Sequence, residues 1–144
     1  MISGEKTGLG VAVVGSGYWG KNLVRNFVNL NALSAICDSH LETLRALGEQ
    51  YKQCRTLTSY PELLRDESIQ AVAIATPAET HGTMVREALI AGKDVFVEKP
   101  LCLSAEMGRS LVDLASNRGR ILMVGHLLWY HPAILKLKEL IDTG

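Results

Sequence analysis

The fold is decided by one stretch near the N-terminus, Val13-Val14-Gly15-Ser16-Gly17-Tyr18-Trp19-Gly20. Its three glycines form G-x-G-x-x-G between an apolar run and a segment with helical spacing. In such a turn the first glycine permits the tight bend, the second lets the backbone approach a pyrophosphate, and the third lets the helix lie close to the strand. The helix N-terminus offers N–H groups and partial positive charge to phosphates. The stretch, including Tyr18 and Trp19, therefore predicts a dinucleotide-binding loop.

An acidic residue follows at the expected distance. The apolar run Leu33–Cys37 ends at Asp38, 18 residues after Gly20, and the dinucleotide pattern places an acid about 20 residues on. A carboxylate there accepts hydrogen bonds from the adenosine ribose and repels a 2′-phosphate, and no arginine adjoins it, so NAD is expected rather than NADP. The alternative is that Asp38 is only the N-cap of the next helix.

Short apolar runs alternate with segments of helical spacing along the rest of the chain. Parallel strands are expected at Leu9–Val14, Leu33–Cys37, Ala71–Ala75, Val95–Val97 and Ile121–Val124. A short helical turn is expected at Pro61–Arg65, a helix start at Ser104, and helix ends at Gly92 and Gly119. These repeats predict an α/β fold: a doubly wound Rossmann sheet of about six parallel strands in the order 3-2-1-4-5-6. It would span residues 9–144, after a flexible tail over residues 1–8.

Composition limits the classes of function. Acidic and basic residues balance at 15 each, with no basic run, so nucleic acid is not an expected partner. No apolar stretch reaches the ~18 residues of a membrane span, and the N-terminus lacks the apolar segment of a signal peptide. Cys37, Cys54 and Cys102 show no CxxC spacing, so neither a disulfide nor a metal site is predicted. This cysteine usage fits the cytoplasm, and Cys37 is expected to be an inert core residue.

Further candidates follow the later strands, because ligands of open α/β sheets bind beyond the carboxyl ends of the strands. Thr76 and Pro77 should border the cofactor, unless they form an ordinary turn. His81 alone is more typical of a surface or packing histidine.

The next two strand ends carry groups capable of proton transfer. Glu98-Lys99-Pro100 places a lysine where it could contact a substrate hydroxyl and move its proton. The alternative is a solvated charge pair that caps the strand. His126 follows the last strand, where a substrate pocket is expected, and its alternative is a hydrogen-bonded structural histidine.

As an ordered set, these residues resemble the glucose–fructose oxidoreductase / inositol dehydrogenase (Gfo/Idh/MocA) family. The set is Gly15-x-Gly17-x-x-Gly20, Asp38, Ala75-Thr76-Pro77, His81, Glu98-Lys99-Pro100 and Gly125-His126. The resemblance implies that Lys99 hydrogen-bonds the substrate near the reacting carbon, and that Thr76, Pro77, His81 and Glu98 shape the nicotinamide half of the site. It also implies a second α/β domain, missing from these 144 residues, that supplies much of the substrate site and the interface of a homo-oligomer.

The stretch after the last strand is similar to one branch of that family. Many members carry Asn-Arg-Arg-Phe there, whereas this chain has Leu127-Leu128-Trp129-Tyr130 followed by His131-Pro132. This form resembles the branch that oxidises UDP-linked amino-sugar uronic acids at the 3-hydroxyl, so a sugar or UDP-sugar substrate is implied. The absent arginines argue against an anion clamp.

The resulting expectation is an NAD-dependent dehydrogenase domain that transfers a hydride between a sugar carbinol carbon and nicotinamide, with Lys99 and His126 as the catalytic candidates. Alone, these residues are expected to bind NAD without turnover. Two alternatives remain open, an NADP-dependent reductase of the same family and a non-catalytic NAD-sensing module.

Overall fold

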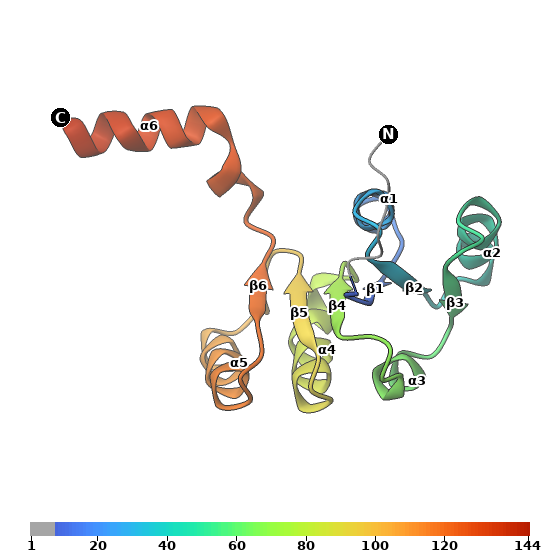
Figure 1. Ribbon diagram of the computed structural model, residues 1–144. Coiled ribbons are helices and arrows are strands. Elements are labelled where there is room, and N and C mark those ends of the chain that lie inside the picture. The colour runs from blue at the N-terminus through green and yellow to red at the C-terminus, as the bar shows by residue number, and fades with distance from the viewer. Residues whose placement is uncertain (1–7) are drawn as a thin grey trace.

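The computed structural model describes residues 8–144, so residues 1–7 of the predicted tail lie outside the described part. Six strands form one sheet in the order β3-β2-β1-β4-β5-β6, and every neighbouring pair is parallel (Figure 1). The strands are β1 (Val11–Val14), β2 (Leu33–Cys37), β3 (Arg55–Leu57), β4 (Ala71–Ile74), β5 (Asp94–Val97) and β6 (Leu122–Val124). The predicted doubly wound Rossmann sheet and its strand order are confirmed.

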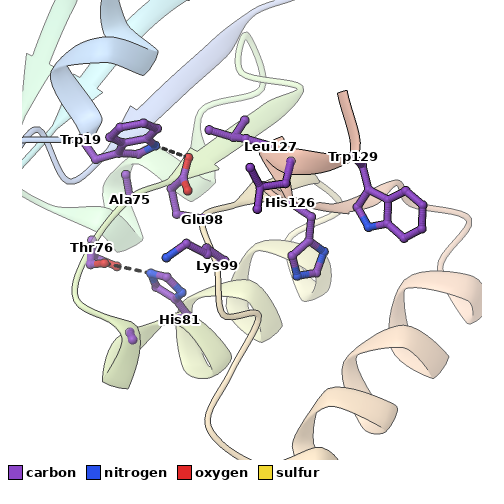
Figure 2. Close-up of a pocket in the computed structure, with 12 residues that line it drawn as sticks. Trp19, Ala75, Thr76, His81, Glu98, Lys99, His126, Leu127 and Trp129 are labelled. Carbon is purple, nitrogen blue, oxygen red and sulfur yellow. Dashed lines mark hydrogen bonds between the residues drawn. The ribbon is translucent and has the colours of Figure 1, made fainter. Parts of the chain in front are cut away.

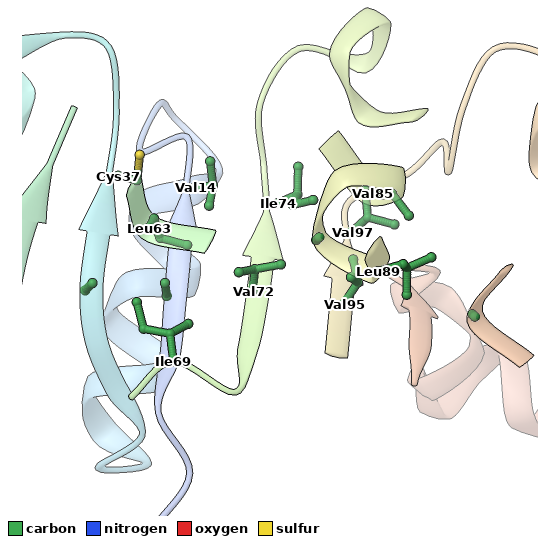
Figure 3. Packing of buried hydrophobic residues seen from close by; sticks show 14 of the residues in the cluster. Val14, Cys37, Leu63, Ile69, Val72, Ile74, Val85, Leu89, Val95 and Val97 are labelled. Atoms are coloured by element: carbon green, nitrogen blue, oxygen red, sulfur yellow. The ribbon is translucent and has the colours of Figure 1, made fainter. Parts of the chain in front are cut away.

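Helices cover both faces of the sheet. They are α1 (Gly20–Asn29), α2 (Leu41–Gln50), α3 (Tyr60–Arg65), α4 (Ala78–Ile90), α5 (Ala105–Asn117), the 3-10 turn η1 (Leu127–Tyr130) and α6 (Pro132–Thr143). In β1, Val11 and Val13 belong to the cluster that includes residues of α1 and α2. Ala12 and Val14 belong to the cluster on the other face, which includes residues of α3, α4 and α5, and Figure 3 shows Val14 in that cluster. This alternation gives the central strand no polar face, as its continuous apolar run requires.

The predicted helix boundaries are confirmed where a residue's own chemistry fixes them. Ser104 is the N-cap of α5 and accepts a hydrogen bond from the Met107 N–H at 3.3 Å. Gly92 and Gly119 follow α4 and α5 with φ of +75° and +58°, a backbone region that other residues avoid.

Two strand predictions needed correction. The sequence pattern identified no strand at β3, where Arg55 and Thr56 are exposed. A three-residue strand at the sheet edge does not need an apolar run. The first strand begins at Val11 rather than at Leu9, because the Gly10 N–H donates to the Gln70 side chain instead of to a neighbouring strand.

The last helix differs from the others because it buries nothing. Helix α6 leads away from the sheet beyond β6 (Figure 1), and none of its residues is buried. Its predicted apolar spacing is present, yet Leu137 is 53% exposed and Ile141 is 72% exposed. Within residues 8–144, no helix has the length and apolar character needed to cross a membrane.

Candidate functional site

The glycine loop lies against the end of β4. Gly15 has φ of +83°, and a Cβ there would lie 2.8 Å from the Thr76 backbone nitrogen. A Cβ on Gly20 would lie 1.9 Å from the Gly15 carbonyl oxygen, so both positions require glycine. At Gly17, by contrast, a Cβ would meet nothing within 4 Å. This space fits a ligand that approaches the backbone closely. The start of α1 has no side-chain cap and no acidic residue in its first turn, so it stays favourable for an anion.

Asp38 is fixed beside this loop by the loop itself. Its Oδ2 accepts hydrogen bonds from the Ser16 N–H at 2.6 Å and from the Ser16 hydroxyl at 3.0 Å. Its Oδ1 accepts one from the His40 N–H at 2.9 Å. The N-cap of α2 is His40, so Asp38 lies two residues before the cap position.

These contacts set the charge of the Asp38 carboxyl group. Partial burial raises the pKa of Asp38. The hydrogen bonds from His40 and Ser16, together with the nearby His40 side chain, lower it by more than burial raises it, so the net pKa is below the ordinary value of 3.8. Asp38 is therefore a carboxylate at neutral pH, with its oxygens oriented at the carboxyl end of β2.

Two cavities adjoin the loop. One, of about 560 Å³, is lined by Asp38, His40, Thr58 and Pro77 together with Gly15 and Gly17. The other, of about 740 Å³, has a lining that includes Trp19, Glu98, Lys99 and His126 and the segment 127–129. Ala75 and Thr76 at the end of β4 line both. The two cavities thus meet at the end of β4, beside the phosphate loop, an arrangement that suits the two halves of an extended dinucleotide.

The larger cavity contains a hydrogen bond that joins distant parts of the chain. The Trp19 indole N–H donates to Glu98 Oε1 at 2.5 Å across 79 residues of sequence (Figure 2). Glu98 is 9% exposed. A Cβ on Gly125 would lie 3.1 Å from Glu98 Oε2, so the carboxylate is held between the indole and the end of β6.

Lys99 and His126 reach the same cavity from neighbouring strand ends (Figure 2). Lys99 is exposed and takes part in none of the ion pairs formed within residues 8–144. It does not form the charge pair considered as its alternative. His126 is also exposed, and its side chain has no hydrogen bond within residues 8–144, which does not fit the hydrogen-bonded structural histidine considered as its alternative. Both side chains are thus accessible to a ligand.

His81 is a buried packing residue, which is one of the two roles that the sequence favoured for it. It is 1% exposed, and its two ring nitrogens lie 2.6 Å from the Pro100 carbonyl oxygen and 2.8 Å from the Thr76 carbonyl oxygen. His81 therefore ties the turn after β4 to the turn after β5, where the Lys99–Pro100 peptide bond is cis. Its direct contact with a cofactor stays a prediction.

The sequence did not indicate Ser16 as a site residue, and it did indicate Tyr18, which the structure does not place in either cavity. Ser16 is fully buried, yet in the sequence it is only a variable position of the glycine pattern. Tyr18 is 90% exposed and lines neither cavity, so its role in cofactor binding stays a prediction. Within the described residues, no group of three or more acidic, histidine or cysteine side chains could hold a metal ion.

Comparison with known proteins identifies the family. A family model described as an oxidoreductase family with an NAD-binding Rossmann fold matches residues 9–126. The chain belongs to the Gfo/Idh/MocA family. UDP-N-acetylglucosamine 3-dehydrogenase of Acidithiobacillus ferrooxidans is 30% identical over 127 residues, which are 88% of this chain and 40% of that enzyme. The chain thus spans about two fifths of this curated relative.

Among the solved structures of similar proteins, some contain NAD and others contain NADP. GenD2 from gentamicin A biosynthesis, solved with NAD, superimposes with a TM-score of 0.86 at 33% identity, covering 92% of this chain and 38% of GenD2. KijD10, a 3-ketoreductase from Actinomadura kijaniata solved with NADP and TDP-benzene, has a TM-score of 0.86 at 25% identity, covering 94% of this chain and 42% of KijD10. This Gfo/Idh/MocA chain therefore has an NAD(P)-binding Rossmann domain of an oxidoreductase, and the family alone leaves the choice of dinucleotide open.

Proposed function

We propose that this chain is the NAD-binding part of a dehydrogenase that oxidises a CH–OH group of a sugar, preferentially a nucleotide-linked sugar. The observation that carries the proposal is the position of Lys99 and His126. Both are accessible in the cavity of about 740 Å³ that adjoins the phosphate loop.

The preference for NAD rests on Asp38. Its carboxylate lies in the smaller cavity, held by Ser16 and His40, where the ribose hydroxyls of the adenosine can donate to it. The diphosphate would lie over Gly17, which leaves space for it, at the start of α1. A 2′-phosphate beside Asp38 would be repelled.

The proposed chemistry uses the second cavity. Bound NAD would supply the acceptor for the hydride that leaves the carbinol carbon, and the hydroxyl group would lose its proton as the carbonyl forms. Lys99 would hydrogen-bond that hydroxyl and assist the removal of its proton, and His126 would contact the same part of the substrate. The segment 127–129 supplies apolar contact in place of arginines.

The nucleotide-sugar preference is supported by two observations. The first is the likeness to UDP-N-acetylglucosamine 3-dehydrogenase. The second is the Gly125-to-Pro132 stretch, which contains no arginine or lysine for clamping a small anionic sugar. We also propose that the additional length of the relatives supplies the rest of the substrate site and the contacts of a homo-oligomer, partly by covering α6.

Calorimetric titration tests the proposal directly. The 144-residue chain should bind NAD with one site and should not oxidise UDP-N-acetylglucosamine or a UDP-amino-sugar uronate. A polypeptide extended to the length of the relatives should reduce NAD with such a sugar, and its Lys99→Ala variant should lose turnover by about 100-fold or more. Normal turnover by that variant would remove Lys99 from the mechanism.

An NADP-dependent reductase is the second candidate, because KijD10 was solved with NADP. The two candidates differ at the smaller cavity. Tighter binding of NADP than of NAD would favour the reductase and contradict the role given to Asp38.

A further inference from the structure

Glu98 is a nearly buried carboxylate without a cationic partner. It is 9% exposed. The ion pairs within residues 8–144 are Arg55–Asp66, Lys136–Glu139 and Lys138–Asp142, and none involves Glu98. Its one side-chain hydrogen bond in the described chain comes from the neutral indole of Trp19. An uncompensated carboxylate in such surroundings is unfavourable, so the site is suited to a cation.

The surroundings of Glu98 limit where that cation can lie. Gly125, directly after β6, adjoins the carboxylate on one side, and Trp19 covers its Oε1. The remaining approach is from the larger cavity, whose lining includes Glu98. The Lys99 ammonium group points into the same cavity but is exposed and forms no ion pair with Glu98 (Figure 2).

The position of Glu98 relates it to one end of the cofactor. This step rests on the proposed function, in which Asp38 binds the adenosine ribose in one cavity and the loop binds the diphosphate. The nicotinamide must then lie in the other cavity, on the Glu98 side. Its ring is a cation when oxidised and becomes neutral when it takes up a hydride. A fixed negative charge therefore stabilises the two forms unequally.

We propose that the charge of Glu98, which the Trp19 indole positions, increases the affinity of this domain for NAD⁺ more than its affinity for NADH. Trp19 is a positioning residue here, since it keeps the carboxylate beside the cavity by its N–H group. The pair thereby biases the bound cofactor toward its oxidised form, and the enzyme toward holding the cofactor that accepts a hydride.

Binding of the two redox forms tests the proposal without any turnover. Calorimetry on the purified chain would give dissociation constants for NAD⁺ and NADH. In Glu98→Gln, NAD⁺ should bind about five- to tenfold more weakly, while NADH changes less than twofold. A tenfold change in the ratio equals a shift of about 30 mV in the potential of a bound two-electron couple.

Further variants separate positioning from a merely structural role. Trp19→Phe keeps the ring and removes the N–H group, so it should change the NAD⁺/NADH ratio in the same direction but by less. The double variant should match Glu98→Gln, because Trp19 acts through Glu98. Glu98→Asp keeps the negative charge, so it should keep most of the wild-type ratio of the NAD⁺ and NADH dissociation constants. It is the variant to measure if Glu98→Gln is unstable. Glu106→Gln, on the exposed first turn of α5, is the charge control and should change neither constant.

The possible failures are distinguishable. If the wild-type chain binds neither cofactor, the proposed function is wrong and the inference falls with it. If both cofactors bind and Glu98→Gln leaves their ratio unchanged, only the inference is wrong. Equal weakening of NAD⁺ and NADH by Trp19→Phe would show that Trp19 merely supports the loop, which also overturns the proposal.

Discussion

Replacing Asp38 by asparagine tests the smaller cavity most directly, because the two side chains have the same shape. An asparagine oxygen can still accept the two hydrogen bonds from Ser16, but its NH₂ group would then face the His40 N–H, which Asp38 accepts at 2.9 Å. The ribose hydroxyls would also lose a charged acceptor. A hydrogen bond to a charged group contributes about 1 kcal/mol more than a neutral one, so NAD should bind roughly fivefold more weakly.

The effect on NADP should have the opposite sign. A unit charge near a 2′-phosphate in partly exposed surroundings corresponds to a repulsion of about 2 kcal/mol, or roughly thirtyfold in affinity. We therefore expect Asp38→Asn to reduce the preference for NAD over NADP by about that factor or more. Calorimetry with both dinucleotides measures it, with Asp113→Asn on the exposed face of α5 as control. An unchanged NAD/NADP ratio in Asp38→Asn would refute the reasoning.

The lowered pKa of Asp38 also predicts how the stability difference between the wild type and Asp38→Asn changes with pH. The pKa of Asp38 in the folded chain is lowered below 3.8. The stability that this group contributes is therefore present above pH 3.8 and is lost as the pH falls through the lowered folded value. The difference in unfolding free energy between the wild type and Asp38→Asn should shrink below pH 3.8. A difference that stays constant from pH 7 to the acid transition would contradict the assigned contacts.

The remaining predictions concern backbone, core and thiol. Gly15→Ala should destabilise the fold by about 2–3 kcal/mol, because φ is +83° and the new methyl group would meet Thr76. Gly17→Ala should leave the thermal midpoint of unfolding unchanged but should weaken NAD binding. Leu63→Ala should reduce the unfolding free energy in urea by about 3 kcal/mol, whereas Leu103→Ala, 70% exposed, should change it by less than ~0.5 kcal/mol. Cys37 is 2% exposed, and burial together with the charges of Asp38 and Glu62 raises its pKa to about 11. Mass spectrometry after iodoacetamide treatment at pH 8 should therefore find Cys37 modified last; early modification would contradict its burial.

The sequence predicted the sheet because the decisive signals were local. Glycine spacing, a strand-ending acid and apolar runs all lie within a few residues of the structures they produce. The edge strand at Arg55–Leu57 gave no such signal, since its first two residues are exposed. Helix α6 shows the converse limit, because apolar spacing shows which face a helix can bury but not what will cover it.

The site was predictable as a set of strand ends but not as a set of contacts. The carboxyl edge of a parallel sheet brings Asp38, Thr76, Glu98 and His126 together once the strand order is known. The hydrogen bond from Trp19 to Glu98 joins residues 79 positions apart and depends on the rotamers of both side chains. No spacing rule predicts such a contact.

The position of η1 has a consequence for specificity. Leu127, Leu128 and Trp129 form one wall of the larger cavity, and the chain continues from them directly into α6, which buries no residue of its own. Contacts made on the exposed face of α6 would therefore also affect the orientation of that wall. If Lys99 and His126 act as proposed, a substitution on the exposed face of α6 would change which sugar is accepted without altering either side chain.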